Sequence, residues 1–251
     1  MPFPVNRMDF EHRALSVLPG VIARNAIVSA PIVYQYDAEN HVLHLQDGGP
    51  RTLKEAYEDP TLDIESFGRE LGQWLAGFHQ NTKAANIGDN KTAKAIYRFA
   101  YSNLSSSLEK FGFEPSLGQS IDQQYGSLLS TDDECLCHGD FWPGNVVVNG
   151  QKLTVVDWEM VRRGCGATDV GQFAAEAWLL DRFRGGRALL RAFLEGYRGA
   201  GELVCTFLFR EHPTIELHFE SSTMVWGGRQ GPPLAFGSHY MSCVPAVFPK
   251  G

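Results

Sequence analysis

The sequence has no apolar run that approaches the roughly 18 residues of a membrane span. Its first residues also lack a secretion signal, because Met1 to Arg7 contains Pro2, Pro4 and a polar Asn6 in place of an apolar core. We therefore expect a soluble, cytoplasmic protein with no membrane partner.

Basic residues are also in short supply. The 22 Lys and Arg residues are outnumbered by 29 Asp and Glu residues, which gives a formal net charge of −7. A general nucleic-acid binder usually carries a basic face, so we expect no nucleic-acid partner. The composition, 43% hydrophobic and 20% charged, is that of an ordinary globular protein, and 251 residues suffice for one large domain or two small lobes.

Cysteine is too sparse for a disulfide framework. The chain has five cysteines, an odd number, at positions 135, 137, 165, 205 and 243. Reduced thiols in a cytosolic setting are the simplest interpretation. Cys135 and Cys137 precede a histidine, but no second ligand pair has the spacing of a zinc finger, so we predict no zinc site.

One stretch, residues 137–159, concentrates acids and an amide around a predicted hairpin. Asp140 and Asn145 precede two apolar runs that are separated by Asn149-Gly150, and Asp157 and Glu159 follow them. Asn-Gly is a strong hairpin signal, because both central residues of a type I′ turn need positive φ. A tight hairpin brings its ends together, so these side chains are expected to surround one small volume that suits a hard cation.

This arrangement fits phosphoryl transfer. In protein kinases an Asp accepts the hydroxyl proton, an Asn five residues later binds Mg²⁺, and an Asp after a short hairpin binds the bridging metal. Asp140, Asn145 and Asp157 repeat that order and that five-residue step. The alternative is that Asp140 and Asn145 only stabilise a turn, a common use of both residue types, while Asp157 ends a strand.

His138-Gly139-Asp140 with Asn145, followed by Asp157-x-Glu159, resembles the catalytic core of the aminoglycoside phosphotransferase and choline kinase superfamily. The resemblance implies that Asp140 is the catalytic base, with His138 supporting its loop. It makes Asn145 and Asp157 the magnesium ligands and Glu159 a second acid near the metal. It further implies ATP and Mg²⁺ as cofactors and a small-molecule hydroxyl compound as the acceptor.

The fold implied by the resemblance is α+β, a protein-kinase-like two-lobe fold with a truncated N-lobe and a mainly helical C-lobe. Residues 1–47 would form the remnant N-lobe and residues 48–251 the C-lobe. In the N-lobe we predict a helix over 8–18, closed by Pro19-Gly20, and an antiparallel hairpin from 31–36 and 41–46.

Three N-lobe residues have two possible roles each. By resemblance, Glu11 supports the site from the helix and pairs with a lysine on a preceding strand, whereas a plain surface role is the alternative. By resemblance, Gln46 and Asp47 form the hinge that meets the adenine of the nucleotide. In the alternative, residues 47–50 are an ordinary turn.

The family's lysine and its glycine-rich phosphate loop are missing, since only ten residues precede Glu11. Two interpretations stay open: a shortened sequence, or a chain that has lost part of its nucleotide-binding site. The second would make the protein a catalytically idle binding or regulatory domain, because phosphoryl transfer depends on positioning and charge stabilisation. An unrelated Mg²⁺-dependent hydrolase is a third, weaker hypothesis.

For the large lobe, helical periodicity predicts helices over 64–79, 93–108, 117–129, 172–183 and 188–197, and a further helix or strand near 216–226. Thr168-Asp169 lies where a helix begins. Asp169 either caps that helix or, by resemblance, fixes the catalytic loop. Arg162 and Arg163 are predicted on a loop, facing solvent or approaching phosphate. The identity of the acceptor and the oligomeric state are not predicted from the sequence.

Overall fold

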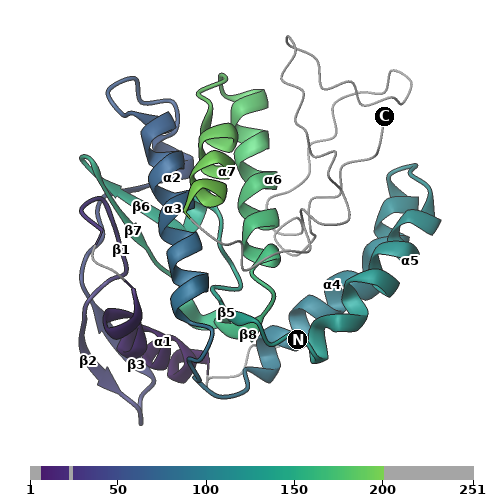
Figure 1. The fold of residues 1–251 in the computed structure, drawn as a ribbon, viewed down its shortest axis with the longest axis horizontal. Helices are drawn as coiled ribbons and strands as arrows, with labels where there is room; N and C mark the ends of the chain where they lie inside the picture. The colour runs from purple at the N-terminus through teal and green to yellow at the C-terminus, as the bar shows by residue number, and fades with distance from the viewer. Residues whose placement is uncertain (1–6, 23–24, 201–251) are drawn as a thin grey trace.

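A computed structural model describes residues 7–22 and 25–200 of the chain (Figure 1). Helices dominate, and the strands form one four-stranded sheet and two small two-stranded sheets. This arrangement confirms the predicted α+β class with a mainly helical larger part. The boundary between lobes at residues 47 and 48 stays a prediction. The predicted helix or strand near 216–226 lies outside the described residues.

The N-terminal elements are helix α1 (Arg7–Val21) and the hairpin of β2 (Val33–Asp37) and β3 (Val42–Leu45). The strands pair antiparallel, as predicted. The predicted helix end at Pro19 is wrong, because α1 continues past Pro19, and the N–H of Ile22 still bonds to the carbonyl of Leu18 (3.0 Å). A proline in the last turn removes only one helical hydrogen bond, and buried Leu18 keeps the turn packed on the core.

The hairpin at the centre of the sequence consists of β6 (Val146–Asn149) and β7 (Lys152–Val155). Asn149 pairs with Lys152, so the two turn residues are Gly150 and Gln151, and the predicted Asn149-Gly150 turn is shifted by one residue. Only Gly150 has a positive φ (59°). Positive φ at the first turn position alone is the pattern of a type II′ turn, in which glycine is preferred.

This hairpin forms the centre of the four-stranded sheet. The short β1 (Val28–Ser29) runs parallel to β7, and β4 (Arg51–Thr52) runs antiparallel to β6. A separate ladder joins β5 (Cys135–Cys137) to β8 (Arg162–Gly164). The two segments that enter and leave the hairpin are therefore paired to each other as well.

The helices of the larger part are α2 (Leu53–Ala56), α3 (Ile64–Asn81), α4 (Lys91–Lys110), α5 (Pro115–Gln124), α6 (Ala167–Phe183) and α7 (Leu189–Gly199). The bounds of α3, α4 and α7 lie within two residues of the predicted ones, whereas α6 begins five residues before the predicted start at 172. The predicted helix over 117–129 divides into α5 and a 3₁₀ segment, η1 (Gly126–Ser130). In Figure 1, α3, α6 and α7 pack side by side, whereas α4 and α5 project away from them as a pair.

An aromatic cluster connects these helices to the loops around the hairpin. Trp74 and Phe78 of α3 stack 5.9 Å apart, and both contact Trp158 edge-on. Phe141 stacks on Trp74 and lies 5.3 Å from Phe173 of α6. Phe141 and Trp158 are completely buried. Burying such rings anchors the loops that carry Asp140 and Asp157 to the core.

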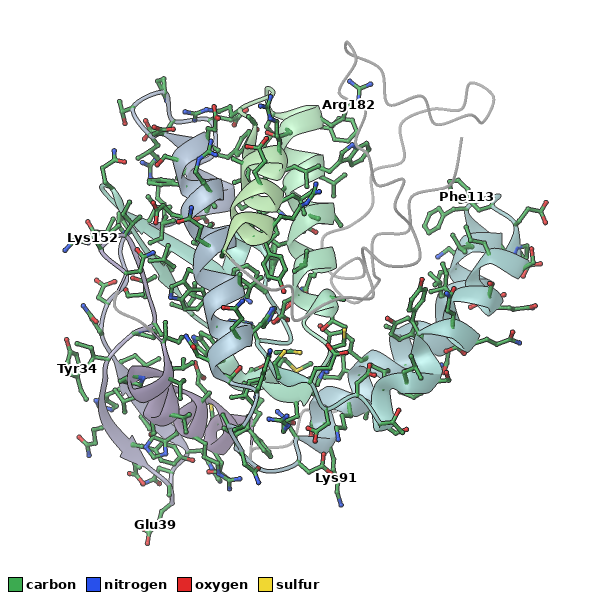
Figure 2. The ribbon with its side chains drawn as sticks, viewed as in Figure 1. Tyr34, Glu39, Lys91, Phe113, Lys152 and Arg182 are labelled. Carbon is green, nitrogen blue, oxygen red and sulfur yellow. The ribbon has the colours of Figure 1, made fainter. Side chains whose placement is uncertain are left out.

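Large apolar side chains are exposed mainly on the β2–β3 hairpin and the α4–α5 pair, and Leu128 of η1 and Phe183 of α6 are exposed as well. Figure 2 shows Tyr34 pointing outward from the hairpin and Phe113 at the tip of the α4–α5 pair. Exposed members of these groups are Ile32, Tyr34, Val42, Phe99, Phe111 and Leu117. Over the described residues, no helix is both long enough and apolar enough to cross a bilayer.

The contact between α3 and α7 predicts opposite effects for two glycines of the same helix. A Cβ on Gly72 would lie 2.1 Å from the carbonyl oxygen of Phe193, so Gly72→Ala must push α7 away and should destabilise the fold by about 1–3 kcal/mol. Gly77 has nothing within 4 Å of such a Cβ. Gly77→Ala should instead stabilise the helix by about 0.5–1 kcal/mol. Urea unfolding of both variants measures this, and equal effects would contradict the close contact.

Candidate active site

The loop after β5 holds Asp140 at a sharp bend. Gly139 has φ +82°, and a Cβ there would lie 2.2 Å from the carbonyl oxygen of Met160, so only glycine fits. His138 is fully buried beneath the bend. Its Nδ1 accepts the N–H of Asp140 (3.2 Å), and its Nε2 donates to the carbonyl of Val156 (3.0 Å). His138 thus supports the loop from inside the protein.

This pattern of hydrogen bonds requires neutral His138 with its proton on Nε2. Burial lowers the pKa of His138, which favours the same neutral form, although the charges of Asp169 and Asp140 act in the opposite direction. The ring joins the catalytic loop to the segment just before Asp157.

Asp169 fixes the backbone of the same loop. Its Oδ2 accepts the N–H of His138 (2.7 Å) and a hydrogen bond from Nε2 of His79 (3.1 Å), and its Oδ1 accepts the N–H of Gly139 (2.9 Å). Burial disfavours its charge, but these bonds hold the pKa of Asp169 below its usual value. Both carboxylate oxygens of Asp169 are engaged by His138, Gly139 and His79, so these contacts fit the role in fixing the loop and not the capping alternative.

The carboxylate of Asp140 is held at both oxygens. Nδ2 of Asn145 donates to Oδ2 (2.9 Å) and to the main-chain carbonyl of Asp140 (3.0 Å). Nε2 of Gln172, from α6, donates to Oδ1 (2.5 Å). Gln172 was not among the predicted site residues. Its spacing of three residues from Asp169 on a predicted helix was an available signal, since such residues share one face.

Asn145 and the segment before Asp157 meet at the base of the hairpin. The N–H of Val156 donates to the carbonyl of Asn145 (2.9 Å), which closes the ladder next to both candidate ligands. Because Nδ2 of Asn145 bonds to Asp140, the carboxamide oxygen is the atom that a cation would take.

Asp157 combines backbone strain with an unfavourable charge. It is one of three described non-glycine residues with positive φ, at φ 65° and ψ 61°, a conformation that favours glycine. Burial, then the negative charges of Glu159, Asp140 and Glu11, raise the pKa of Asp157 to about 7. A bound cation would relieve this repulsion, so the arrangement fits the hard metal ion expected here.

Glu159 and Glu11 connect α1 to the same segment. Glu159 forms an ion pair with Arg7 (2.8 Å). Glu11 is buried, so the surface alternative for this residue is wrong, and its Oε1 accepts the N–H of Trp158 (3.3 Å). Burial raises the pKa of Glu11 despite the bond from Trp158. Helix α1 therefore holds the two residues that follow Asp157.

A further polar residue, Asn90, supports the site. Asn90, the N-cap of α4, donates to the carbonyls of Glu159 (2.9 Å) and Val161 (3.0 Å), and its position in a predicted loop gave no signal. The prediction that Arg162 and Arg163 face solvent or phosphate is wrong. Arg162 is buried on the ring of Tyr97, and Arg163 donates to the carbonyls of Ala85 and Lys83.

The segment proposed to meet adenine lies against the central hairpin. The N–H of Gln46 donates to the carbonyl of Ile32 (2.8 Å), and Oδ1 of Asp47 accepts the N–H of Gly49 (2.9 Å). A Cβ on Gly48 would touch Thr154 and Val147. The segment is thus placed beside β6 and β7, and the nucleotide role of Gln46 and Asp47 stays a prediction.

Within the parts of the chain described by the structure, no three His, Cys, Asp or Glu side chains form a metal cluster. Protein ligands for a cation at this site would therefore be Asp157 and the amide oxygen of Asn145, with phosphate oxygens and water completing the coordination. Magnesium sites that hold phosphates commonly have few protein ligands. Glu159 forms its ion pair with Arg7, and its role as a second acid near the metal stays a prediction.

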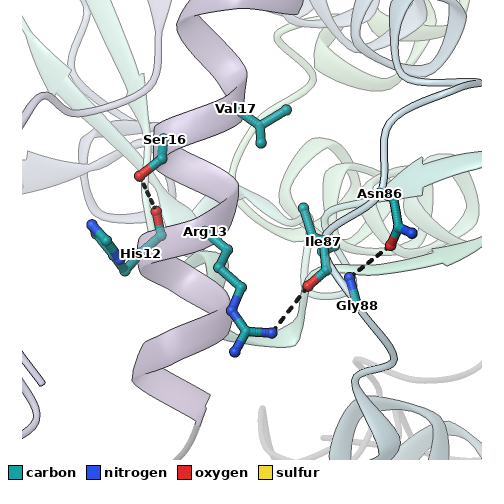
Figure 3. A pocket seen from close by; sticks show the side chains of 7 residues that line it. All are labelled: His12, Arg13, Ser16, Val17, Asn86, Ile87 and Gly88. Carbon is teal, nitrogen blue, oxygen red and sulfur yellow. Dashed lines mark hydrogen bonds between the residues drawn. The ribbon is translucent and has the colours of Figure 1, made fainter.

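A separate shallow depression of about 560 Å³ lies between α1 and the loop before α4 (Figure 3). Its walls include His12, Ser16 and Val17, and Arg13 reaches across it to the carbonyl of Ile87 (3.3 Å). Asp140, Asn145 and Asp157 do not line it. This hollow is therefore distinct from the group of acids.

The family model described as "Phosphotransferase enzyme family" matches residues 2–208. The chain belongs to this family. The resemblance to aminoglycoside phosphotransferases and choline kinases that the sequence suggested is thereby confirmed.

Two curated relatives of this phosphotransferase-family chain are a kinase and a phosphotransferase by name. A 4-hydroxytryptamine kinase of Psilocybe cubensis is 26% identical over 227 residues, which cover 77% of this chain and 61% of the relative. Phosphotransferase FrzJ of Cladobotryum sp is 28% identical over 204 residues, 68% of this chain and 53% of the relative. The chain thus spans between half and two thirds of the length of these relatives.

Solved structures of similar fold include a ternary complex of streptomycin, ATP and APH(2″)-IIa, at 17% identity and a TM-score of 0.48, covering 77% of this chain and 67% of that one. An ethanolamine kinase of Plasmodium vivax has 14% identity and a TM-score of 0.45, covering 80% of this chain and 60% of that one. Overlap at this level carries no argument about substrate.

The raised pKa of Asp157 predicts that Asp157→Asn stabilises the metal-free protein. Above pH 7 the Asp157 carboxyl is ionised in the folded state, which disfavours that charge. Below the ordinary pKa of 3.8 the carboxyl is protonated in both the folded and the unfolded state, so the penalty is absent. The gain in free energy of unfolding from Asp157→Asn should grow between pH 4 and pH 7 and reach up to about 4 kcal/mol at pH 8.

Urea unfolding in EDTA at pH 5 and pH 8 measures this gain. Glu109→Gln, an exposed acid near the end of α4, is the control and should show no such pH dependence. A gain from Asp157→Asn that is the same at both pH values would contradict the predicted charge repulsion.

Proposed function

We propose that this chain is an ATP- and Mg²⁺-dependent phosphotransferase that moves the γ-phosphoryl group to a hydroxyl of a small molecule. One observation carries the proposal: the carboxylate of Asp140 is fixed by the amide of Asn145, at the base of the hairpin that leads to Asp157. Family membership supports the reaction class.

The proposed roles follow from this geometry. Asp140 orients the acceptor hydroxyl and takes its proton, and each oxygen keeps a lone pair for that purpose beside its amide donor. Asn145 and Asp157 hold the metal, which when bound neutralises the charge on the phosphates. His138 and Asp169 keep the loop in shape, and Glu11 holds the segment after Asp157. Gln46 and Asp47 are proposed to meet the adenine.

For the acceptor we propose a hydroxyl compound that also carries an amine. The name of a curated relative, 4-hydroxytryptamine kinase, points to an amine, and four acids, Asp140, Asp157, Glu11 and Glu159, gather at this site. A cationic amine would be attracted to such a field. The suitable probes are 4-hydroxytryptamine, ethanolamine and streptomycin, tested beside an uncharged sugar.

A catalytically idle binding or regulatory domain is the second candidate. It is favoured because no lysine within the described residues forms an ion pair with Glu11, which instead accepts the N–H of Trp158. A kinase of this type uses such a lysine to position the phosphates. The two candidates differ in phosphoryl transfer.

Nucleotide binding is tested first, by thermal shift of the full chain with ATP and Mg²⁺ together and with each alone. A ligand that binds only the folded state raises the melting temperature. We expect a Mg²⁺-dependent shift that Asp157→Ala abolishes and Asp140→Asn retains. The absence of any shift in folded protein would refute the phosphotransferase and favour the idle domain.

Phosphoryl transfer is tested next, by acceptor-dependent release of ADP with the four probes. Asp140→Asn should lower kcat by about 10²–10⁴-fold with little change in the KM for ATP, because it removes the proton acceptor but not the metal ligands. Nucleotide binding without transfer to any probe, and without loss of ATP hydrolysis in Asp140→Asn, would favour the idle domain.

A further inference from the structure

Each oxygen of the Asp140 carboxylate accepts a hydrogen bond from a different amide. Asn145 belongs to the same loop, so its bond moves with that loop. Gln172 belongs to α6 and is only 2% exposed. Its bond therefore fixes the carboxylate relative to a helix that is packed in the core. The pair of bonds restricts rotation of the carboxylate about its own axis.

The orientation of the Gln172 amide is itself determined by its neighbours. Its nitrogen faces a carboxylate, whereas its Oε1 lies 3.5 Å from the hydroxyl of Tyr97. The reversed amide would place an oxygen against a negatively charged oxygen, which is unfavourable. The Tyr97 hydroxyl also donates to the carbonyl of Gly139 (2.9 Å), the residue before Asp140.

Tyr97 is in turn held firmly in place. It is 2% exposed, and the buried guanidinium of Arg162 stacks on its ring at 4.2 Å. Such a desolvated cation–π contact is stronger than one at the surface. Helix α4 therefore supports the catalytic loop at Tyr97, two turns beyond the point where Asn90 binds the segment after Asp157.

We propose that Gln172, supported by Tyr97, is a positioning residue that aims the Asp140 carboxylate at the acceptor hydroxyl. The role of Gln172 in the reaction rests on the proposed phosphotransferase function. Its role in fixing the carboxylate does not. A carboxylate freed at one oxygen samples several directions, and misplacement by about 1 Å costs on the order of 100-fold in rate.

A purely structural role for Gln172 makes a different prediction. In that case its loss lowers stability but leaves the rate per folded molecule unchanged. A positioning role instead lowers kcat while the KM for ATP and the Mg²⁺-dependent thermal shift stay the same, because neither metal ligand is altered.

The test compares three variants with the parent chain. Gln172→Met keeps the length of the side chain but removes the donor, and Gln172→Ala also removes its volume. Tyr97→Phe keeps the ring beneath Arg162 and removes only the hydroxyl. Gln73→Ala, exposed on α3, is the control for a glutamine lost from a helix. ATP hydrolysis with water as acceptor supplies a rate without knowledge of the natural acceptor.

We expect Gln172→Met and Gln172→Ala to lower kcat by 10- to 100-fold at unchanged KM for ATP, Tyr97→Phe to lower it less, and Gln73→Ala to have no effect. Parental kcat in folded Gln172→Met would overturn the proposal. If the parent neither hydrolyses ATP nor transfers phosphate, the proposed function fails. Crystal structures of the parent and of Gln172→Met then test whether Gln172 fixes the orientation of the Asp140 carboxylate. A rotated or disordered Asp140 carboxylate supports it, and an unchanged carboxylate overturns it.

Discussion

The site depends on the buried carboxylate of Asp169, which has a supporting role and no proposed part in the chemical step. Asp169 accepts two consecutive backbone N–H groups, those of His138 and Gly139, and a bond from His79 of α3. Breaking a buried network of this kind leaves unpaired polar groups and is strongly destabilising. The bend at Gly139, and with it the place of Asp140, is thus fixed by contacts from α6 and α3.

Other features of the site oppose stability. Asp157 has a left-handed backbone, and its carboxylate lies near those of Glu159, Asp140 and Glu11. Only Glu159 has a direct cationic partner in the ion pairs described, Arg7. Strain and repulsion of this kind persist where the surrounding structure enforces them and where a ligand removes them. The rigid support from Asp169 and the unfavourable charge at Asp157 are therefore complementary parts of one site.

Much of the fold was predictable, because periodic apolar residues determine the long helices and alternation determines the β2–β3 hairpin. The motif residues Asp140, Asn145 and Asp157 were predictable because they are close in sequence to a recognisable hairpin. Gln172 and Asn90 were not identified, since each acts through a contact between segments distant in sequence. The turn shifted by one residue because pairing of Asn149 with Lys152 outweighed the local preference of Asn-Gly.

The hydrogen bond from Val156 to the carbonyl of Asn145 closes the hairpin at the end where the candidate ligands lie, whereas the Gly150-Gln151 turn at the other end is exposed. Lengthening both strands equally at the turn would leave this bond, and the separation of Asn145 from Asp157, unchanged. A single residue inserted into one strand would reverse the facing of every side chain beyond it. The hairpin can therefore vary in length by whole residue pairs at its tip, but not at its base.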